Sequence, residues 1–347
     1  MRIAMVSLYL PGDSKIGVGY QAHAMANHLA ARGHDVVVMS PDRPGESPAY
    51  EYRAGTNDRP RLVRFPWSLR KVDWSGFDVL HAHGDDWFLL GAHRPPHVRT
   101  VHGSCFVEAR HIRGARERAR MVAIGMGEVL ATTAIADRSY GVSAATQHVY
   151  PWLDGVIPCG VELSAFAGPR TEEPDPTILF VGTDAGRKRG RLLREAFRRV
   201  VQPKLPDARL WMVCSDAPGG AGVEVLGRVS DAELAERYRR AWAFCLPSSY
   251  EGFGVPYVEA LAAGCPVVAT PNAGASEVLD RGRYGVLAEP TADALGQALL
   301  AMLSDPGTRD RLRAAGVVRS REYSWTAVVD GYEHVYDELV RTRQHVP

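Results

Sequence analysis

The sequence predicts an α/β protein with two Rossmann-like domains, each built on a doubly wound parallel sheet. Its length of 347 residues corresponds to about two domains at roughly 150 residues per domain. Short β-branched runs alternate with longer segments of helical periodicity along the whole chain, which is typical of βαβ units. The composition, 46% hydrophobic and 23% charged, is that of a globular protein and excludes a disordered or fibrous chain.

The strand-like runs fall into two series with an aperiodic, proline-bearing stretch at residues 161–176 between them. A helix is expected over residues 20–32, ending at Gly33, and a last helix over residues 325–343. The expected strands of the two halves are residues 3–8, 35–40, 77–81, 98–102 and 140–143, and residues 177–181, 209–214, 223–226, 243–246, 266–270 and 285–287.

We therefore expect domains at residues 1–165 and 166–324, with the C-terminal helix, about residues 325–347, returning to the first domain. Ligands of open α/β sheets bind at the carboxyl ends of the strands. Two such sheets facing each other predict a site in the cleft between the domains.

Charge and cysteine content exclude several kinds of partner. The formal charge is +1, so no global field favours nucleic acid. Five scattered cysteines show neither a CxxC pair nor a disulfide framework, which is consistent with a reducing compartment. We see no signal segment and no run of about 18 apolar residues. The expected location is the cytoplasm.

The most specific motif is SSYEGFGVPYVEALAAG, residues 248–264. It follows a buried-looking strand, and Gly252 and Gly254 allow close approach of the backbone to a ligand. Pro256 suits the first turn of a helix whose N-terminus offers unpaired amides to an anion. Glu251 and Glu259, eight residues apart, could reach two parts of one extended ligand. The alternative is a solvated Glu251 and a Glu259 that only satisfies a neighbour.

A second motif, FVGTDAGRKRG at residues 180–190, again joins a strand to a helix through glycines. Arg187, Lys188 and Arg189 crowd a helix N-terminus, where the macrodipole disfavours cations. An anion such as a diphosphate between them would explain the cluster. A solvated basic loop is the alternative.

With these motifs, the second half resembles the retaining glycosyltransferases of family 4, which have the GT-B fold. The matching stretches lie at about residues 156–290 in the family's order, and the Glu-x7-Glu pair is the most specific of them. The first half matches more loosely. The family often has arginine where this chain has Thr183 and asparagine where it has Cys159.

The resemblance implies the role of each site residue. Arg187 and Lys188 would bind the diphosphate of the donor, and Glu259 the ribose of its nucleotide. Glu251 and the backbone of four following residues would hold the transferred sugar. Gly17 and Gly19 would lie in a loop near the reacting sugar, with His102 beside the anomeric centre. The four backbone positions are Gly252, Phe253, Gly254 and Val255.

Transfer from a nucleotide sugar develops negative charge on a leaving diphosphate, which a metal or fixed cations can stabilise. This sequence offers fixed cations, so no metal or other cofactor is expected. The expected reaction is retaining transfer from a UDP-, GDP-, ADP- or TDP-sugar to a hydroxylated small molecule, a polysaccharide precursor or a lipid-linked glycan. The family further implies that residues 1–165 bind the acceptor and residues 166–324 the donor, and that the leaving diphosphate helps to deprotonate the acceptor.

Several alternatives stay open at this point. The GVGYQA sequence from Gly17, with Asp42 after the next expected strand, fits a nicotinamide-binding fingerprint, although its loop is too long. The same fold also serves sugar-nucleotide epimerases or hydrolases, and a non-catalytic binder is a further alternative. HAHGDDW, residues 81–87, admits a metal site, with a hydrogen-bonded histidine at a strand end as the alternative. The arginines of residues 110–120 admit peripheral contact with an anionic membrane, though a solvated helix face is favoured.

Overall fold

The computed structural model describes residues 1–14, 16–112 and 114–344, and Gln344 by its backbone alone. The chain forms two compact units. Unit 1 comprises Met1–Gly160 together with the chain from Trp325 onward, and unit 2 comprises Val161–Ser324. The change of unit therefore falls a few residues before the predicted position at 165/166, because the short helix α6 (Leu163–Phe166) packs within unit 2.

Unit 1 contains a seven-stranded sheet in the order β3-β2-β1-β4-β5-β6-β7, and its strand pairs are parallel. The chain runs outward in one direction from β1 to β2 and in the other from β1 to β4, so the topological switch point lies between β1 and β4. The strands are β1 (Arg2–Val6), β2 (Asp35–Ser40), β3 (Glu51–Ala54), β4 (Val79–Ala82), β5 (His97–Val101), β6 (Arg138–Gly141) and β7 (Gly155–Val156). The helices are α1 (Gly17–Ala31), α2 (Arg61–Ser68), α3 (Cys105–Ala109), α4 (Ala115–Leu130), α5 (Ala144–Val149) and α13 (Trp325–Gln344).

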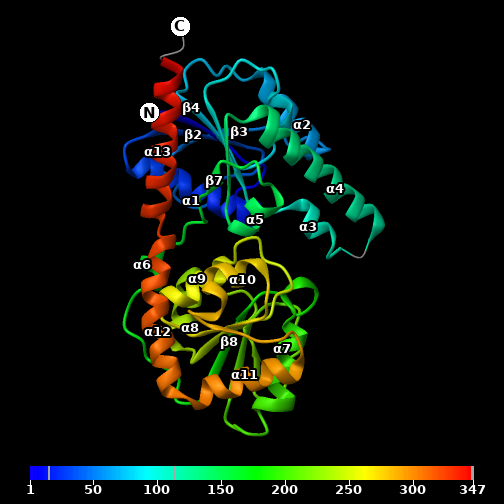
Figure 1. The fold of residues 1–347 in the computed structure, drawn as a ribbon, viewed down its shortest axis with the longest axis vertical. Coiled ribbons are helices and arrows are strands. Elements are labelled where there is room, and N and C mark those ends of the chain that lie inside the picture. The colour runs from blue at the N-terminus through cyan, green and yellow to red at the C-terminus, as the bar shows by residue number, and fades with distance from the viewer. Residues whose placement is uncertain (15, 113, 345–347) are drawn as a thin grey trace. The chain divides into compact units, whose positions relative to one another are not determined.

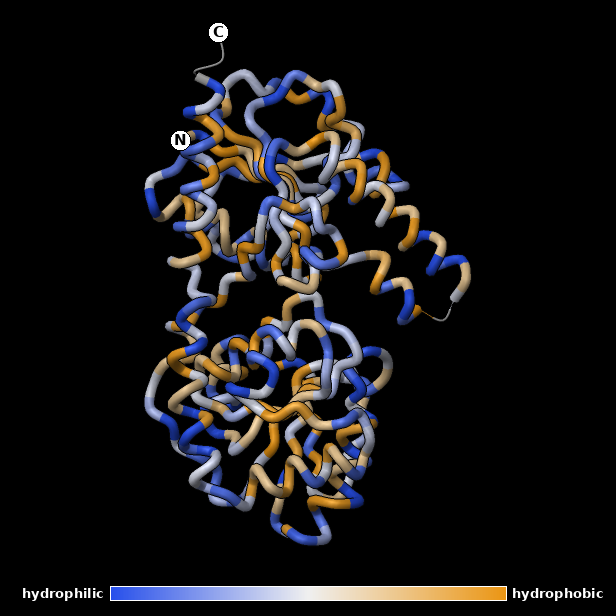
Figure 2. Tube along the Cα trace, viewed as in Figure 1, coloured by the Kyte–Doolittle hydropathy of each residue, from blue (hydrophilic) through white to orange (hydrophobic). Residues whose placement is uncertain are grey.

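Both faces of this sheet are covered, as the alternation of β1 shows. Ile3 and Met5 belong to one core cluster, and Ala4 and Val6 to another on the opposite face. The first cluster includes side chains of α1 and α13, so the last helix of the chain forms part of the core of unit 1 (Figure 1). In Figure 2 the strands of both units are largely hydrophobic, while polar residues gather on the outer turns and helices.

Unit 2 contains a six-stranded parallel sheet in the order β10-β9-β8-β11-β12-β13. Its switch point lies between β8 and β11. The strands are β8 (Thr177–Val181), β9 (Arg209–Val213), β10 (Val223–Val225), β11 (Ala243–Leu246), β12 (Val267–Ala269) and β13 (Val286–Leu287). Besides α6, the helices are α7 (Gly190–Ala196), α8 (Asp231–Arg240), α9 (Val255–Ala262), α10 (Ala273–Val278), α11 (Ala292–Ser304) and α12 (Pro306–Ser320).

The predicted fold class is confirmed, and the differences concern weak local signals. The sequence analysis missed β3 and β7, two edge strands without a continuous apolar run. It also began the first helix at residue 20, whereas α1 starts at Gly17. Gly17 and Gly19 therefore lie in the first turn of a helix and not in a loop as predicted.

The arginine-rich stretch at residues 110–120 begins directly after α3 and runs into the first part of α4, which starts at Ala115; its Arg113 lies outside the described residues. Val122, Met126 and Leu130 of α4 are exposed at 41%, 61% and 40% of their surface. Within the described chain, no helix combines the length and apolar character needed to cross a bilayer.

Candidate functional site

The loops after β8 and β11 leave the same edge of the unit 2 sheet, because the two strands are parallel neighbours. A backbone hydrogen bond joins the loops: the amide of Ser249 donates to the carbonyl of Arg187 at 2.8 Å. Arg187 also donates through Nη1 to the carbonyl of Tyr250 at 3.0 Å. The structure thus brings the two motifs predicted from sequence together at the switch point of this sheet.

Glu251 is the centre of this arrangement. Its Oε1 lies 2.8 Å from Nζ of Lys188, and its Oε2 lies 3.0 Å from Nη1 of Arg187. The carboxylate is 7% exposed, whereas the side chains of Lys188 and Arg187 are 17% and 42% exposed. Burial acts to raise the pKa of Glu251, but the two cations outweigh burial and hold it below the ordinary value. Glu251 is therefore ionised at neutral pH.

Lys188 is held in this position by its own turn. Burial lowers the pKa of Lys188, against the opposing effect of Glu251. A Cβ at Gly182 would lie 3.1 Å from Cβ of Lys188, so glycine there leaves room for the lysine stem. The turn around the lysine needs left-handed backbone at Gly186 (φ +74°) and at Arg189 (φ +54°).

The segment from Gly252 to Val255 leads into α9, which begins at Val255 with Gly254 as N-cap. Gly254 has φ +97°, and a Cβ there would lie 2.5 Å from the Tyr257 ring. Phe253 is buried, and its ring packs against the ring of Tyr323 at 5.3 Å. Phe253 can therefore offer a ligand only its backbone, as the resemblance implies.

Glu259 lies on α9, is half-buried, and accepts a hydrogen bond from the hydroxyl of Tyr238 at 3.0 Å. Burial raises the pKa of Glu259 to about 7, and the Tyr238 hydrogen bond opposes that rise. The carboxyl group of Glu259 is therefore partly protonated near neutral pH, whereas that of Glu251 is ionised. The sequence analysis missed Tyr238, because it comes from α8 and carries no local signal of this contact.

Asp216, also missed from sequence, fixes the loop that carries Lys188. Its carboxylate accepts hydrogen bonds from the amide of Asp184 at 2.9 Å and from that of Ala185 at 3.4 Å. Arg194 of α7 pairs with the Asp184 carboxylate at 2.8 Å. Thr183 donates its hydroxyl proton to the carbonyl of Ala185 at 2.8 Å.

The remaining predicted residues belong to unit 1. His102 directly follows β5, is half-buried, and shares a hydrogen bond of 2.9 Å with Nδ1 of His83 through its Nε2. Gln21, one turn after Gly17, lines the same small cavity as His102, so α1 begins near this histidine. A Cβ at Gly19 would lie 2.8 Å from the carbonyl oxygen of Tyr9, whereas one at Gly17 would meet nothing within 4 Å. Glycine at position 19 thus allows α1 to pack closely against the backbone of Tyr9, whereas a side chain at Gly17 would have free space around its Cβ.

His81, His83 and Asp86 of HAHGDDW each contact another polar side chain of the protein. His81 bonds to the hydroxyls of Tyr336 and Thr100. Asp86 is fully buried between Arg99 and His97. Among the described residues, no group of three or more His, Cys, Asp or Glu side chains is placed to hold a metal ion. The structure supports the alternative of hydrogen-bonded histidines.

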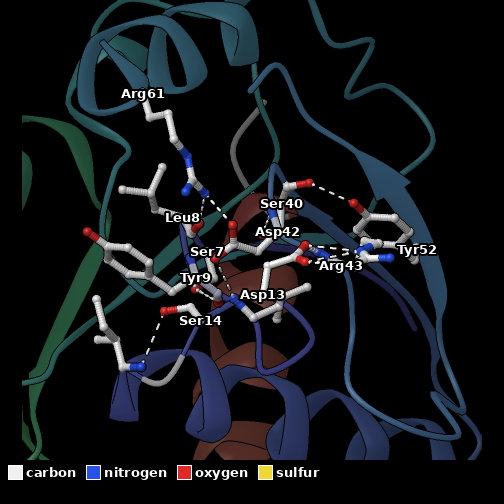
Figure 3. Close-up of polar contacts among 12 residues, drawn as sticks. Ser7, Leu8, Tyr9, Asp13, Ser14, Ser40, Asp42, Arg43, Tyr52 and Arg61 are labelled. Carbon is white, nitrogen blue, oxygen red and sulfur yellow. Dashed lines mark hydrogen bonds and ion pairs between the residues drawn. The ribbon is translucent and has the colours of Figure 1, made fainter. Parts of the chain in front are cut away.

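Asp42 does not present the free carboxylate that a nicotinamide fingerprint needs. It is buried, pairs with the guanidinium of Arg61 (Figure 3), and accepts a hydrogen bond from the amide of Leu10 at 3.4 Å. Arg61 also donates to the carbonyl of Leu8 at 3.2 Å, so this pair fixes the loop after β1 (Figure 3). That loop extends from Val6 to the start of α1 and is far longer than the tight turn of a dinucleotide site.

Two family profiles and several curated relatives match this chain. Residues 164–318 match the family profile of glycosyl transferases group 1, and residues 16–165 match that of glycosyltransferase family 4. The chain is 31% identical to phosphatidyl-myo-inositol mannosyltransferase of Mycobacterium tuberculosis, over 98% of this chain and 97% of that protein. It is also 31% identical to O-antigen chain mannosyltransferase B of Escherichia coli, over 45% of each chain.

Solved structures share the fold. Sucrose-phosphate synthase from Thermosynechococcus elongatus superposes with a TM-score of 0.78 at 21% identity, covering 98% of this chain and 99% of that one. HepE of Anabaena, solved with UDP and glucose, gives 0.75 at 16% identity, covering 97% and 99%. The two parallel α/β units have the GT-B fold of these neighbours, and the family profiles define a glycosyltransferase. Within that class, the chain belongs to glycosyltransferase family 4, the group 1 glycosyl transferases.

Proposed function

We propose that this enzyme transfers a hexosyl group from a nucleotide diphosphate sugar to an acceptor hydroxyl, with retention of the anomeric configuration and without a metal ion. The observation that carries the proposal is that Arg187 and Lys188 both form ion pairs with Glu251, beyond the carboxyl ends of β8 and β11. Two cations and one carboxylate leave a net positive charge at the edge where ligands of open sheets bind.

The two cations supply the charge stabilisation of the leaving diphosphate that a metal ion supplies in other transferases. A leaving diphosphate gains negative charge in the transition state, and fixed cations aimed at it stabilise that charge without rearrangement. The amides at the start of α9 add their partial positive charge. Arg187 adjoins Lys188 and takes the place of the arginine that the family often has at the position of Thr183.

Glu251 serves to position the sugar and not as a covalent nucleophile. Its two carboxylate oxygens are already paired with cations and its pKa lies below the ordinary value, which makes it a weak base and a weak nucleophile. When a diphosphate draws Lys188 and Arg187 to itself, the carboxylate becomes free to accept hydrogen bonds from sugar hydroxyls. The leaving diphosphate, as the stronger base, would take the acceptor proton.

Glu259 is proposed to hold the nucleotide ribose. Vicinal hydroxyls donate well to an ionised carboxylate, and Glu259 lies on the same helix that begins beside Glu251. The hydroxyl of Tyr238 fixes one carboxylate oxygen, Oε2, and leaves the other for the ligand. His102 in unit 1 is proposed to contact the transferred sugar next to its anomeric centre.

Mannose is the first donor sugar to test and an inositol ring the first acceptor, since the Mycobacterium tuberculosis relative that spans nearly the whole chain is a phosphatidyl-myo-inositol mannosyltransferase. The candidate nucleotides of the donor are UDP, GDP, ADP and TDP. All five cysteines are free and four of them are buried, which accords with action in the reducing cytoplasm.

The test is thermal unfolding with each nucleoside diphosphate, with and without EDTA, followed by product analysis. A ligand at 100 times its Kd adds about 2.7 kcal/mol to the unfolding free energy, a readable rise in Tm. We expect one nucleoside diphosphate to raise Tm, EDTA to leave the rise unchanged, and the product to keep the donor's anomeric configuration by NMR. Loss of transfer in EDTA with recovery on adding Mn²⁺ would refute metal independence, and an inverted product would refute retention.

A further inference from the structure

Three histidine rings of unit 1 form a continuous stack that ends at His102. His81 lies in β4, His83 just after that strand, and His102 just after the neighbouring β5. The His81 and His83 rings are stacked with their centroids 4.6 Å apart and 12° between their planes. The His83 and His102 rings are stacked at 5.2 Å and 27°. His83, which the proposed function does not use, is buried between the other two.

The inner end of the stack is fixed by α13. Nδ1 of His81 bonds to the hydroxyl of Tyr336, and its Nε2 bonds to Oγ1 of Thr100 at 2.8 Å. Oγ1 of Thr100 also bonds to the hydroxyl of Tyr332 at 2.6 Å. Both nitrogens of His81 are thereby engaged, so this ring forms a fixed surface against which His83 stacks.

The bond between His83 and His102 has a direction that burial determines. Burial lowers the pKa of His83 well below its ordinary value and that of His102 to about 4, so both rings are neutral at pH 7. A neutral imidazole has one N–H donor and one acceptor nitrogen. Since Nδ1 of His83 and Nε2 of His102 share a hydrogen bond, one of these two nitrogens carries the proton and the other accepts it.

The other nitrogen of His83 decides which ring carries it. Nε2 of His83 is buried and, within the described residues, has no hydrogen-bond partner. The adjoining cavity measures about 10 Å³, at the lower limit of what one water needs. Buried N–H groups without an acceptor are rarer in proteins than unfilled acceptors. The favoured arrangement leaves Nε2 of His83 without a proton and places the proton on its Nδ1.

We infer that His83 is a positioning residue: it donates its Nδ1–H to Nε2 of His102 and thereby holds His102 in the tautomer that carries its proton on Nδ1. His102 is half-buried, and across the described chain its Nδ1 has no hydrogen-bond partner. His102 thus offers substrate a hydrogen-bond donor and no basic nitrogen. It can donate to an oxygen of the sugar or acceptor, and it cannot take the acceptor proton. The mechanistic part of this inference rests on the proposed function.

The first test reads the tautomer directly in the full-length free enzyme. Two-bond ¹H–¹⁵N correlation at pH 7 distinguishes protonated from bare ring nitrogens, and His102→Gln identifies the His102 signals by their loss. We expect His102 protonated at Nδ1 and bare at Nε2. The opposite pattern overturns the inference. This measurement uses no substrate, so its outcome is independent of whether the enzyme transfers a sugar.

Matched variants test the role of the donor. His83→Phe keeps an aromatic ring but removes the N–H, whereas His83→Asn keeps an N–H near the position of Nδ1. We expect His83→Phe to shift His102 toward the Nε2–H tautomer and His83→Asn to retain the wild-type tautomer. Persistence of the wild-type tautomer in His83→Phe overturns the inference. If that variant does not fold, the wild-type and His83→Asn spectra still decide.

Kinetics then separate positioning from general damage. With the donor identified, we expect His83→Phe to lower kcat by about tenfold, the effect of one lost hydrogen bond. The affinity for the nucleoside diphosphate should stay within about twofold, since unit 2 holds the proposed diphosphate contacts. His83→Asn should recover most of the loss. Equal losses in both variants overturn the positioning role. Absence of transfer by the wild-type enzyme with every donor counts against the proposed function, and the spectra still test the tautomer.

Discussion

Replacing Lys188 by alanine tests the donor site most directly. A charge-assisted hydrogen bond such as that from an ammonium to a diphosphate contributes about 1.5–3 kcal/mol. Its loss corresponds to about 10- to 150-fold weaker binding of the nucleoside diphosphate. The nucleoside alone lacks the diphosphate, so its affinity should change by no more than about twofold. Isothermal titration calorimetry with both ligands measures the two changes on one preparation.

The free enzyme should tolerate this change. Lys188 and Glu251 are 17% and 7% exposed and lie 2.8 Å apart, and removing one partner of a buried pair typically costs about 3–5 kcal/mol. Here Glu251 keeps Arg187 at 3.0 Å, so we expect a smaller loss of unfolding free energy, below about 3 kcal/mol. Chemical denaturation measures that loss.

Lys204→Ala supplies the matched control. Lys204 is an exposed lysine of the same unit, away from the loops after β8 and β11. Its replacement should change stability by no more than about 0.5 kcal/mol and leave both affinities unaltered. If Lys188→Ala weakens nucleoside and nucleoside diphosphate equally, or weakens neither more than Lys204→Ala does, the assignment of the diphosphate contact is wrong.

Three further predictions concern the other site residues. Glu251→Gln should lower the transfer rate by about 100-fold or more while leaving nucleoside diphosphate affinity equal or tighter by calorimetry, because the two cations lose their competitor; near-normal turnover would contradict its role. Burial raises the pKa of Glu259 to about 7, so its carboxylate forms as pH rises from 6 to 8, and affinity for the nucleotide sugar should increase over that window. Glu259→Gln should remove the increase, and a wild-type titration without any pH dependence would exclude the ribose contact. By urea denaturation, Gly19→Ala should lose about 1–3 kcal/mol, because its Cβ would lie 2.8 Å from the Tyr9 carbonyl oxygen. Gly17→Ala should be neutral or gain up to about 1 kcal/mol, and the reverse order would contradict this packing argument.

Features that depend only on residues close together in the sequence were predictable from it. The β-branched runs marked the central strands, since a strand buried on both faces needs continuous apolar side chains. Gly254 and Pro256 marked the start of α9, because each has a conformational property that few residues share. The cations at 187–188 stood out because they lie against the preference of a helix N-terminus. The two short edge strands escaped because they bury little and have no apolar run.

The sequence by itself determined the fold class, the family and the placement of Glu251, Lys188 and His102 in segments that follow strands. Only the tertiary structure decided what those side chains contact. The bond from Tyr238 to Glu259, the two amides held by Asp216 and the stack of His83 on His102 join residues from different elements. Sheet order and helix packing set these distances, which cannot be predicted from the local conformational preferences of the residues. The pKa values follow from the same cause, since burial and neighbouring charge exist only in the folded chain.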